Sequence, residues 1–227
     1  MNYTTWFHPD VTIIASIPSF SSLLTSSPPL KPNLNPREII NHGDLLHVDF
    51  GVTALRLNTD TQHLAYVLYP GETSIPPGLK DGLRKVNRLQ DIVRSQMKIG
   101  ITGNKILKAS LKQMRSEGIE GKIYCHPIGD WGHSAGTLIG MTNLQTGVPV
   151  LGDLPLLGEG YYSVELYAES LVGEIGEVVN FYLEEDVYFD KETRTWEWAW
   201  GRQEEFWVIK SEEGGKGEDV DGKMELK

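Results

Sequence analysis

The sequence contains a single cysteine, Cys125, among its 227 residues. One thiol excludes an internal disulfide and a zinc site built from several cysteines, and it makes the reducing cytoplasm the expected location. There is no run of about 18 apolar residues, so the sequence predicts no membrane-spanning helix. The first residues carry no basic segment followed by a long apolar one, and we therefore expect no signal peptide.

Basic residues are also scarce. There are 21 Lys and Arg residues against 31 Asp and Glu, which gives a formal net charge of −10. Nucleic-acid binding and binding to anionic membranes both depend on clustered cations, so neither class of partner is expected. With 40% hydrophobic and 23% charged residues, the composition is that of a folded domain with an apolar core.

Hydrophobic periodicity predicts strands, then two helices, then more strands. Proline and serine make residues 18–36 an expected loop, and the acidic, glycine-rich segment 211–227 is expected to be a disordered tail. Residues 1–210 are then one α+β domain in which helices cover an antiparallel sheet. The predicted strands and helices are strands near 45–49 and 65–68, helices over 79–98 and from Thr102 to Gly118, and strands over 161–168, 177–189 and 205–210.

Two aspartates stand in or near the first predicted strands. Asp49 lies among apolar residues, and Asp60 follows eleven residues later. A hairpin centred on Ala54 and Leu55 would place the two carboxylates directly opposite each other, about 4.5–5.5 Å apart at Cβ. Two ionised carboxylates so close repel, unless one is protonated or a cation lies between them. A divalent metal such as Mn²⁺ is one interpretation, and two exposed turn aspartates are the other.

Further candidate ligands follow in the second half of the chain. His126 and His133 flank a short glycine-containing segment, and Glu165 and Glu184 stand in aromatic, strand-like runs where an unpaired charge is costly to bury. Histidine is a common nitrogen ligand, and a second histidine can stabilise developing negative charge. Glu185 is the alternative to Glu184, because both stand in the same acidic run.

The order of these residues resembles that of the pita-bread metallohydrolases, which include methionine aminopeptidase, aminopeptidase P, prolidase and the metal-free creatinase. The segment from Gly43 to Gly51 resembles the strand that carries the family's first metal ligand. The segment from His126 to His133, which begins His-Pro-Ile-Gly, resembles the family's histidine segment. The segment from Glu184 to Val187 resembles the strand that carries the last ligand in the Xaa-Pro branch. The resemblance covers residues 43–209.

The resemblance implies a pita-bread fold and a dinuclear hydrolase of peptides, of the Xaa-Pro aminopeptidase or dipeptidase type. Asp49 would bind one metal, His126 and Glu165 the other, and Asp60 and Glu184 would bridge both. A hydroxide between the metals would attack the peptide carbonyl, with Glu165 moving the proton and His133 holding the oxyanion. Mn²⁺ is the expected metal, with Co²⁺, Fe²⁺ or Zn²⁺ as other occupants. The expected partner is a peptide substrate, and the sequence leaves a homodimer open.

Three features depart from the family pattern. Residues 18–41 lack the family's additional histidine, with His8, His42 and His47 poorly placed to replace it, and Tyr182 stands where Xaa-Pro members often have arginine. Only 48 residues precede Asp49, so the helices that open the fold are expected to be reduced or missing, which would expose apolar sheet surface. These departures favour one alternative, a non-catalytic pita-bread protein that binds a partner. A creatinase-type small-molecule hydrolase is a third interpretation, and the retained ligand set counts against its metal-free chemistry.

Overall fold

The computed structural model describes residues 3–19, 39–129 and 132–210. The segment 20–38, with most of the expected loop, and the expected tail 211–227 lie outside the described residues. Within the described part, no helix is both long and apolar enough to cross a membrane.

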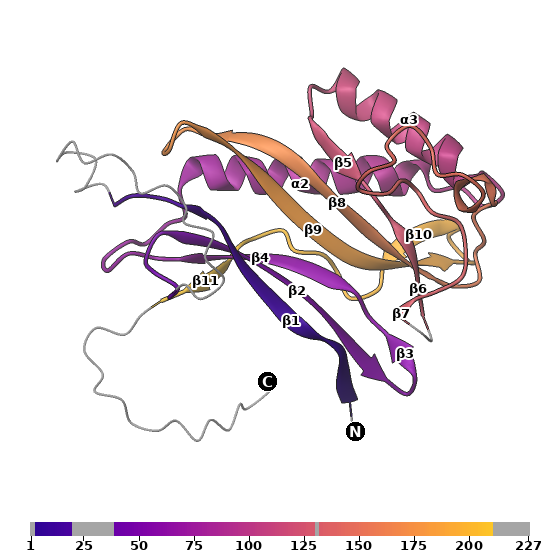
Figure 1. Cartoon of the computed structure of the whole chain (residues 1–227), viewed down its shortest axis with the longest axis horizontal. Coiled ribbons are helices and arrows are strands. Elements are labelled where there is room, and N and C mark those ends of the chain that lie inside the picture. Colours follow the sequence, from indigo (N-terminus) through magenta and orange to yellow (C-terminus); the bar gives the residue numbers. More distant parts are fainter. Residues whose placement is uncertain (1–2, 20–38, 130–131, 211–227) are drawn as a thin grey trace.

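One sheet of eleven strands organises the described residues (Figure 1). Its main path runs β1-β2-β4-β9-β8-β6-β7, while β3 pairs with β2, β5 with β8, β10 with β9, and β11 runs parallel to β4. The strands are β1 Tyr3–Ser16, β2 Asp44–Ala54, β3 Leu57–Asn58, β4 Thr61–Val67, β5 Gly121–Ile123, β6 His126–Gly129, β7 Gly132–His133, β8 Tyr161–Val172, β9 Glu177–Asp190, β10 Thr195–Trp198 and β11 Trp207–Ile209.

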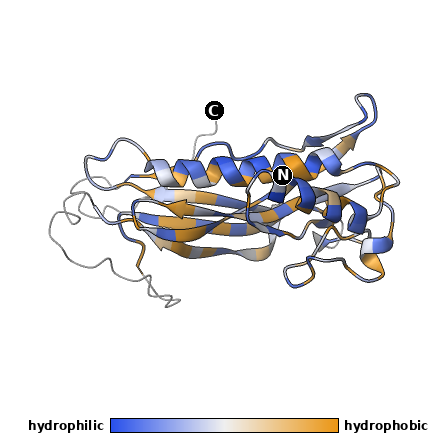
Figure 2. Cartoon of the chain, turned by 90° about the horizontal axis from the view of Figure 1, so that it is seen from above, coloured by the Kyte–Doolittle hydropathy of each residue, from blue (hydrophilic) through white to orange (hydrophobic). Residues whose placement is uncertain are grey.

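Two helices cover the half of the sheet that contains β8 and β9: α2 (Pro77–Gln96) and α3 (Gly103–Ser116). Helix α2 begins with a proline, which has no N–H to leave unpaired, and the Thr102 hydroxyl caps α3 by accepting from the Lys105 N–H. Both helices lie within a few residues of their predicted ranges. In Figure 2, α2 runs along one side of the layer of strands.

The approach of α2 to the sheet depends on a glycine. A Cβ at Gly82 would come within 2.2 Å of the Phe181 ring on β9, so no larger residue fits without moving the helix. The main core lies in this interface and contains fully buried side chains from both layers, such as Leu79, Val86 and Leu183.

The first strand is a structural element that the sequence analysis did not predict. Polar residues interrupt its apolar pattern, yet β1 runs antiparallel to β2 over its length, with Val11 opposite Val48 and Ile13 opposite Leu46. No helix precedes Asp49 in the described residues. Backbone pairing to β2 explains why this segment is a strand despite its composition.

One face of β1, β2, β4 and β11 carries apolar side chains away from the main core. Leu46, Ala65 and Val67 form a small separate cluster with Ile13 packed against it. On the same face, the side chains of Val11 and Trp207 are 51% and 50% exposed. The expected exposure of apolar sheet surface is therefore present in the described residues.

Candidate metal centre

The hairpin that carries Asp49 and Asp60 has a different register from the predicted one. Its turn lies at Leu55 and Arg56, both with positive φ (52° and 68°), and Asp49 pairs with Gln62. The prediction that Asp60 lies directly opposite Asp49 is therefore wrong by two residues, because this left-handed turn is centred one residue later. A shift of two residues keeps every side chain on its face, so the two aspartates are diagonal neighbours on one side of the sheet.

The remaining candidate residues come to this face from three other strands. Glu165 on β8 pairs directly with Glu184 on β9, and Glu184 pairs with Gln62 on β4. His126, at the start of β6, lies opposite Ser163. Directly paired residues on one sheet face have neighbouring Cβ atoms, so this topology brings the carboxylates and the imidazole together.

Side-chain distances show that the candidate ligands converge. The Nε2 atom of His126 lies 3.1 Å from Glu184 Oε1, 3.5 Å from Glu165 Oε2 and 3.8 Å from Asp60 Oδ2. The Nε2 atom of His133 lies 3.3 Å from Asp60 Oδ2, and the two histidine rings are 4.0 Å apart.

These contacts form three overlapping sets, and within each set the ligand atoms lie within 4.8 Å of one another. The sets are Asp49, Asp60 and Glu184; His126, Glu165 and Glu184; and Asp60, His126 and His133. All six residues singled out from the sequence thus belong to one cluster, with Asp60, His126 and Glu184 each in two sets.

Burial and the interactions between charged groups shift the pKa values of residues in this cluster. Burial, followed by the charges of Glu184, Asp60 and Glu165, raises the pKa of Asp49 to about 7. Burial also raises the pKa of Asp60 and of Glu184 above their usual values. Burial alone would lower the pKa of His126, but hydrogen bonds to Glu165 and Glu184 outweigh it and raise that pKa to about 11.

The donor set fits divalent cations. Asp49 Oδ1 is buried and has no hydrogen-bond partner among the described residues, so it is an acceptor that a cation would satisfy. Four carboxylates with one or two imidazoles are the ligands that Mn²⁺ and related metals take, and a cation among them would offset their repulsion.

Gln62 and His47 belong to the site, although sequence reasoning missed the first and judged the second poorly placed. The Gln62 amide donates to Glu165 Oε1 at 2.6 Å and to Glu184 Oε2 at 2.8 Å, while its Oε1 accepts from His47 Nε2 at 3.0 Å. Burial lowers the pKa of His47, which favours the neutral ring. The signal was present in the strand period: His47 and Gln62 stand two residues from Asp49 and Asp60, on the same face.

The alternative ligand Glu185 lies outside the cluster. As the neighbour of Glu184 on β9 it faces the other side of the sheet, where its Oε1 lies 3.1 Å from His63 Nε2 and accepts from the Gln203 N–H at 2.8 Å. The thiol of Cys125 is fully buried and donates to the Glu165 carbonyl, and burial raises its pKa, so it is not an activated nucleophile.

A row of aromatic side chains lies beside the cluster, from β8, β9 and the connection between β5 and β6. Tyr182, at the position where Xaa-Pro members often have arginine, packs 5.2 Å from Tyr167 and 5.3 Å from the His47 ring, measured between ring centroids. Tyr124 continues the row at 6.4 Å from Tyr167. This row forms an aromatic wall beside the acidic cluster.

No family model and no curated protein matches the sequence. Solved structures do match, among them prolidases and methionine aminopeptidases. The X-Pro aminopeptidase from Thermotoga maritima is 20% identical, with a TM-score of 0.57 over 78% of this chain and 46% of its own. A dipeptidase from Pyrococcus horikoshii is 15% identical, with a TM-score of 0.59 over 90% of this chain and 49% of its own.

A third match has no peptidase name. It is the N-terminal domain of the FACT complex subunit SPT16 from Cicer arietinum, 11% identical, with a TM-score of 0.54 over 84% of this chain and 42% of its own. The chain spans about half the length of each of these three proteins. With a curled antiparallel sheet, helices over its second half and these structural neighbours, the chain has the pita-bread fold of the aminopeptidases and prolidases.

Proposed function

We propose that this protein is a metal-dependent hydrolase of peptides that binds two divalent cations at the six-residue cluster. The observation that carries the proposal is the convergence of four carboxylates and two imidazoles, from five strands and from Asp60 between β3 and β4, in three overlapping sets of ligand atoms. Burying this much like charge is unfavourable without a cation, so a purely structural role for the cluster is disfavoured. The structural neighbours include peptidases, which supports the class of reaction.

The cluster divides into two metal positions that share residues. Asp49 would hold one ion and His126 with Glu165 the other, while Asp60 and Glu184, each in two of the overlapping sets, would bridge them. Bound divalent ions lower the pKa of water and polarise a carbonyl, which is the chemistry they would supply here. Mn²⁺ suits the carboxylate-rich set best, with Co²⁺, Fe²⁺ and Zn²⁺ as other occupants.

Two side chains of the cluster would have roles other than metal binding: one would transfer a proton, and the other would stabilise negative charge on the substrate. The Glu165 carboxylate lies at the edge of the cluster, with its side chain 18% exposed, so it can reach both solvent and the reacting centre and move a proton between them. The His133 side chain is 66% exposed beside Asp60, where its N–H can donate to an oxyanion on a bound substrate.

For the substrate we favour an Xaa-Pro peptide, cleaved at the bond between its N-terminal residue and the proline. The aromatic wall of Tyr124, Tyr167 and Tyr182 gives an apolar surface against which a proline ring would pack. An X-Pro aminopeptidase is among the structural neighbours. The single, buried Cys125 fits a cytoplasmic location for this activity.

The test combines metal content with turnover. Purified protein is stripped with a chelator, loaded with Mn²⁺, desalted and measured for bound metal, and then assayed on Xaa-Pro dipeptides and on longer peptides with proline second. About two ions per chain with hydrolysis of either class supports the proposal. Bound metal without turnover on any of these peptides rejects the Xaa-Pro assignment, and absence of tight metal binding rejects the metal centre.

A second candidate is a pita-bread module that binds a partner without catalysis. The specific observation in its favour is that Gln62 and His126 already satisfy Glu165 and Glu184 by hydrogen bonds, so the site can stay folded without metal. The match to a FACT-complex subunit domain agrees with it. Turnover of the metal-loaded protein separates the two, since this candidate hydrolyses none of the peptides whether or not it binds the ions.

A further inference from the structure

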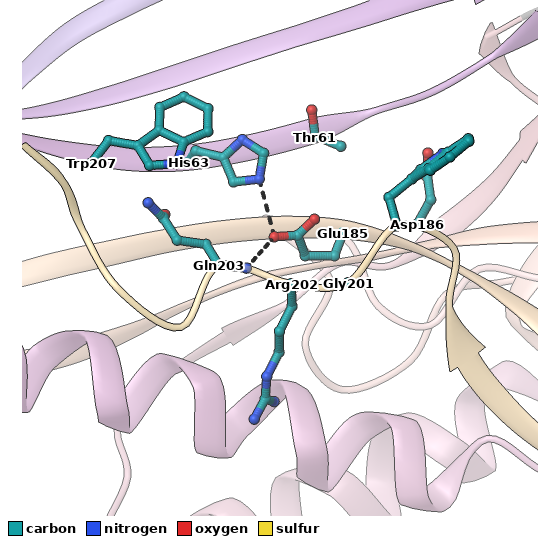
Figure 3. Close-up of a pocket in the computed structure, with 9 residues that line it drawn as sticks. Thr61, His63, Glu185, Asp186, Gly201, Arg202, Gln203 and Trp207 are labelled. Carbon is teal, nitrogen blue, oxygen red and sulfur yellow. Dashed lines mark hydrogen bonds and ion pairs between the residues drawn. The ribbon is translucent and has the colours of Figure 1, made fainter. Parts of the chain in front are cut away.

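A cavity of about 260 Å³ lies behind the candidate metal centre (Figure 3). Strands β4 and β9 form one wall, and the segment that leads from β10 to β11 crosses over it as the other. The cavity is lined by Thr61, His63, Glu185, Asp186, Trp200, Gly201, Arg202, Gln203 and Trp207. Its volume is below the roughly 300–1,000 Å³ of pockets for drug-sized ligands, so it suits a single functional group and its stem.

The cavity is distinct from the metal centre because strand residues alternate between faces. Thr61 stands between Asp60 and Gln62, and Glu185 follows Glu184, so both project from the reverse of the face that carries the acidic cluster. Asp186, two residues after Glu184, lies at the boundary between the two sites: it lines the cavity, and its Oδ2 accepts from the Asp60 N–H. None of the six clustered residues lines the cavity.

Two polar atoms of the lining have no partner among the described residues. Asp186 is only 6% exposed, and its Oδ1 atom is buried and makes no hydrogen bond, whereas its Oδ2 accepts from the Asp60 N–H at 3.2 Å. The Nδ1 atom of His63 is also buried and unpaired. A buried carboxylate oxygen without a donor is costly, and a ligand that donates a hydrogen bond would remove that cost.

The charged residues of the lining determine whether the cavity favours an anion or a cation. Glu185 and Asp186 bring two carboxylates, while the one arginine is committed elsewhere. In Figure 3 the Arg202 side chain turns away from the cavity towards α2, where its guanidinium lies 2.6 Å from Asp91 Oδ1. An anion would therefore meet two carboxylates without a free cation, whereas a cation would be attracted.

Two indole rings complete the wall. The Trp200 side chain is 90% exposed, and Trp207, half exposed, packs one side against the His63 ring at 4.7 Å between centroids. Large exposed apolar rings at the mouth of an acidic cavity are the arrangement that recognises cations, because the ring face carries negative potential. We propose that this cavity binds one guanidinium or primary ammonium group, with Asp186 Oδ1 as the hydrogen-bond acceptor and the indoles as the walls.

The experiment titrates the full-length protein with propylguanidinium and follows tryptophan fluorescence and melting temperature. Propylurea, its neutral isostere, is the matched ligand control. We expect saturable binding of propylguanidinium and no saturable response to propylurea. Equal responses to both ligands, or no response to either, would overturn the proposal.

Variants locate the site. Asp186→Asn keeps the shape and the acceptor for the Asp60 N–H but removes the charge, and should weaken propylguanidinium binding about tenfold. Glu205→Gln, an equal charge change at an exposed residue of the same segment that does not line the cavity, should leave it unchanged. Trp200→Ala, at an exposed ring that can be removed without unfolding the protein, should also weaken binding.

Two further measurements identify where the cation binds and whether it comes from a protein side chain or from a small molecule. Asp49→Asn should bind propylguanidinium as the wild type does. If Asp49→Asn loses binding while Asp186→Asn keeps it, the cation occupies the metal centre and the proposal is wrong. An acetylated Gly-Arg-Gly amide is compared with free propylguanidinium: tighter peptide binding assigns the cavity to a protein side chain, tighter binding of the free cation assigns it to a small molecule, and either supports the proposed chemistry.

Discussion

Gln62 and Glu184 form the backbone pair between β4 and β9 in the described residues, and the same two residues meet again through their side chains. The first half of the sheet (β1, β2 and β4) therefore joins the second half (β9, β8 and β6) at the candidate metal centre itself. The Gln62 amide, which donates to Glu184 at 2.8 Å and to Glu165 at 2.6 Å, holds carboxylates from the second half against the strand of the first. Loss of this contact should affect both the fold and the site.

Replacing Gln62 tests this junction. Gln62→Leu fills a similar volume but removes one donor from the buried Glu184 and one from the partly buried Glu165, which should lower the free energy of unfolding of the metal-free protein by about 1–3 kcal/mol. Urea denaturation followed by circular dichroism measures the loss. Gln96→Leu, which removes a partly buried glutamine contact between α2 and α3, is the matched control and should cost less. An equal cost for both variants would show that the junction has no special role.

Sequence reasoning reached the clustered residues and their order along the chain but not the hairpin register or the supporting contacts. Asp49, Glu165 and Glu184 could be recognised because a carboxylate in a strand-like apolar run is unusual. The hairpin register could not, because it depends on Leu55 and Arg56 adopting positive φ, for which neither residue type is favoured.

Two other features had weak sequence signals. Gln62 and His47 gain their importance from partners more than 100 residues away and from each other, so nothing local marks Gln62 as part of a site. Strand β1 forms because β2 offers it a backbone edge, which no local pattern in residues 3–16 indicates.

Asp60→Ala should abolish binding of both metals. Asp60 belongs to two of the three ligand sets and stands between Asp49 and the histidines, so its loss removes a ligand shared by both ions. Elemental analysis after Mn²⁺ loading should fall from about two ions per chain to near zero. Asp81→Ala on α2, an exposed aspartate that pairs with Arg84 and lies outside the cluster, should keep the full metal content. Normal metal content in Asp60→Ala would refute the bridging role.

His133→Ala distinguishes an oxyanion donor from a ligand. If His133 donates to the substrate, the variant should retain its metals while turnover falls by roughly 10²–10³, the cost of losing one oxyanion donor. Metal content and turnover are measured on the same preparation. Because His133 Nε2 also lies 3.3 Å from Asp60 Oδ2, loss of one ion in the variant would instead make His133 a ligand, and unchanged turnover with full metal would remove it from the mechanism.

The stability of the metal-free protein should fall as pH rises. The folded state raises the pKa of Asp49 from 3.8 to about 7, so the folded protein holds a proton that the unfolded chain has released, and the associated stability is present below pH 3.8 and lost as pH rises to about 7. His126 acts in the same direction, because its pKa rises from 6.5 to about 11. Melting temperatures of chelator-treated protein should therefore decrease from pH 4 through neutrality.

Bound metal should reverse this trend in the acidic and neutral range. The ions need deprotonated carboxylates and a neutral imidazole, so loading releases the protons that the folded site holds, and metal binding tightens as pH rises. Calorimetric titration of Mn²⁺ at pH 6.5 in two buffers of different ionisation enthalpy measures that release, which should exceed one proton per chain. With Asp49→Asn the proton release should shrink and the melting temperature of the metal-free protein should vary less between pH 4 and 7, because the group responsible no longer titrates. A proton release that Asp49→Asn leaves unchanged would place the titrating group elsewhere in the cluster.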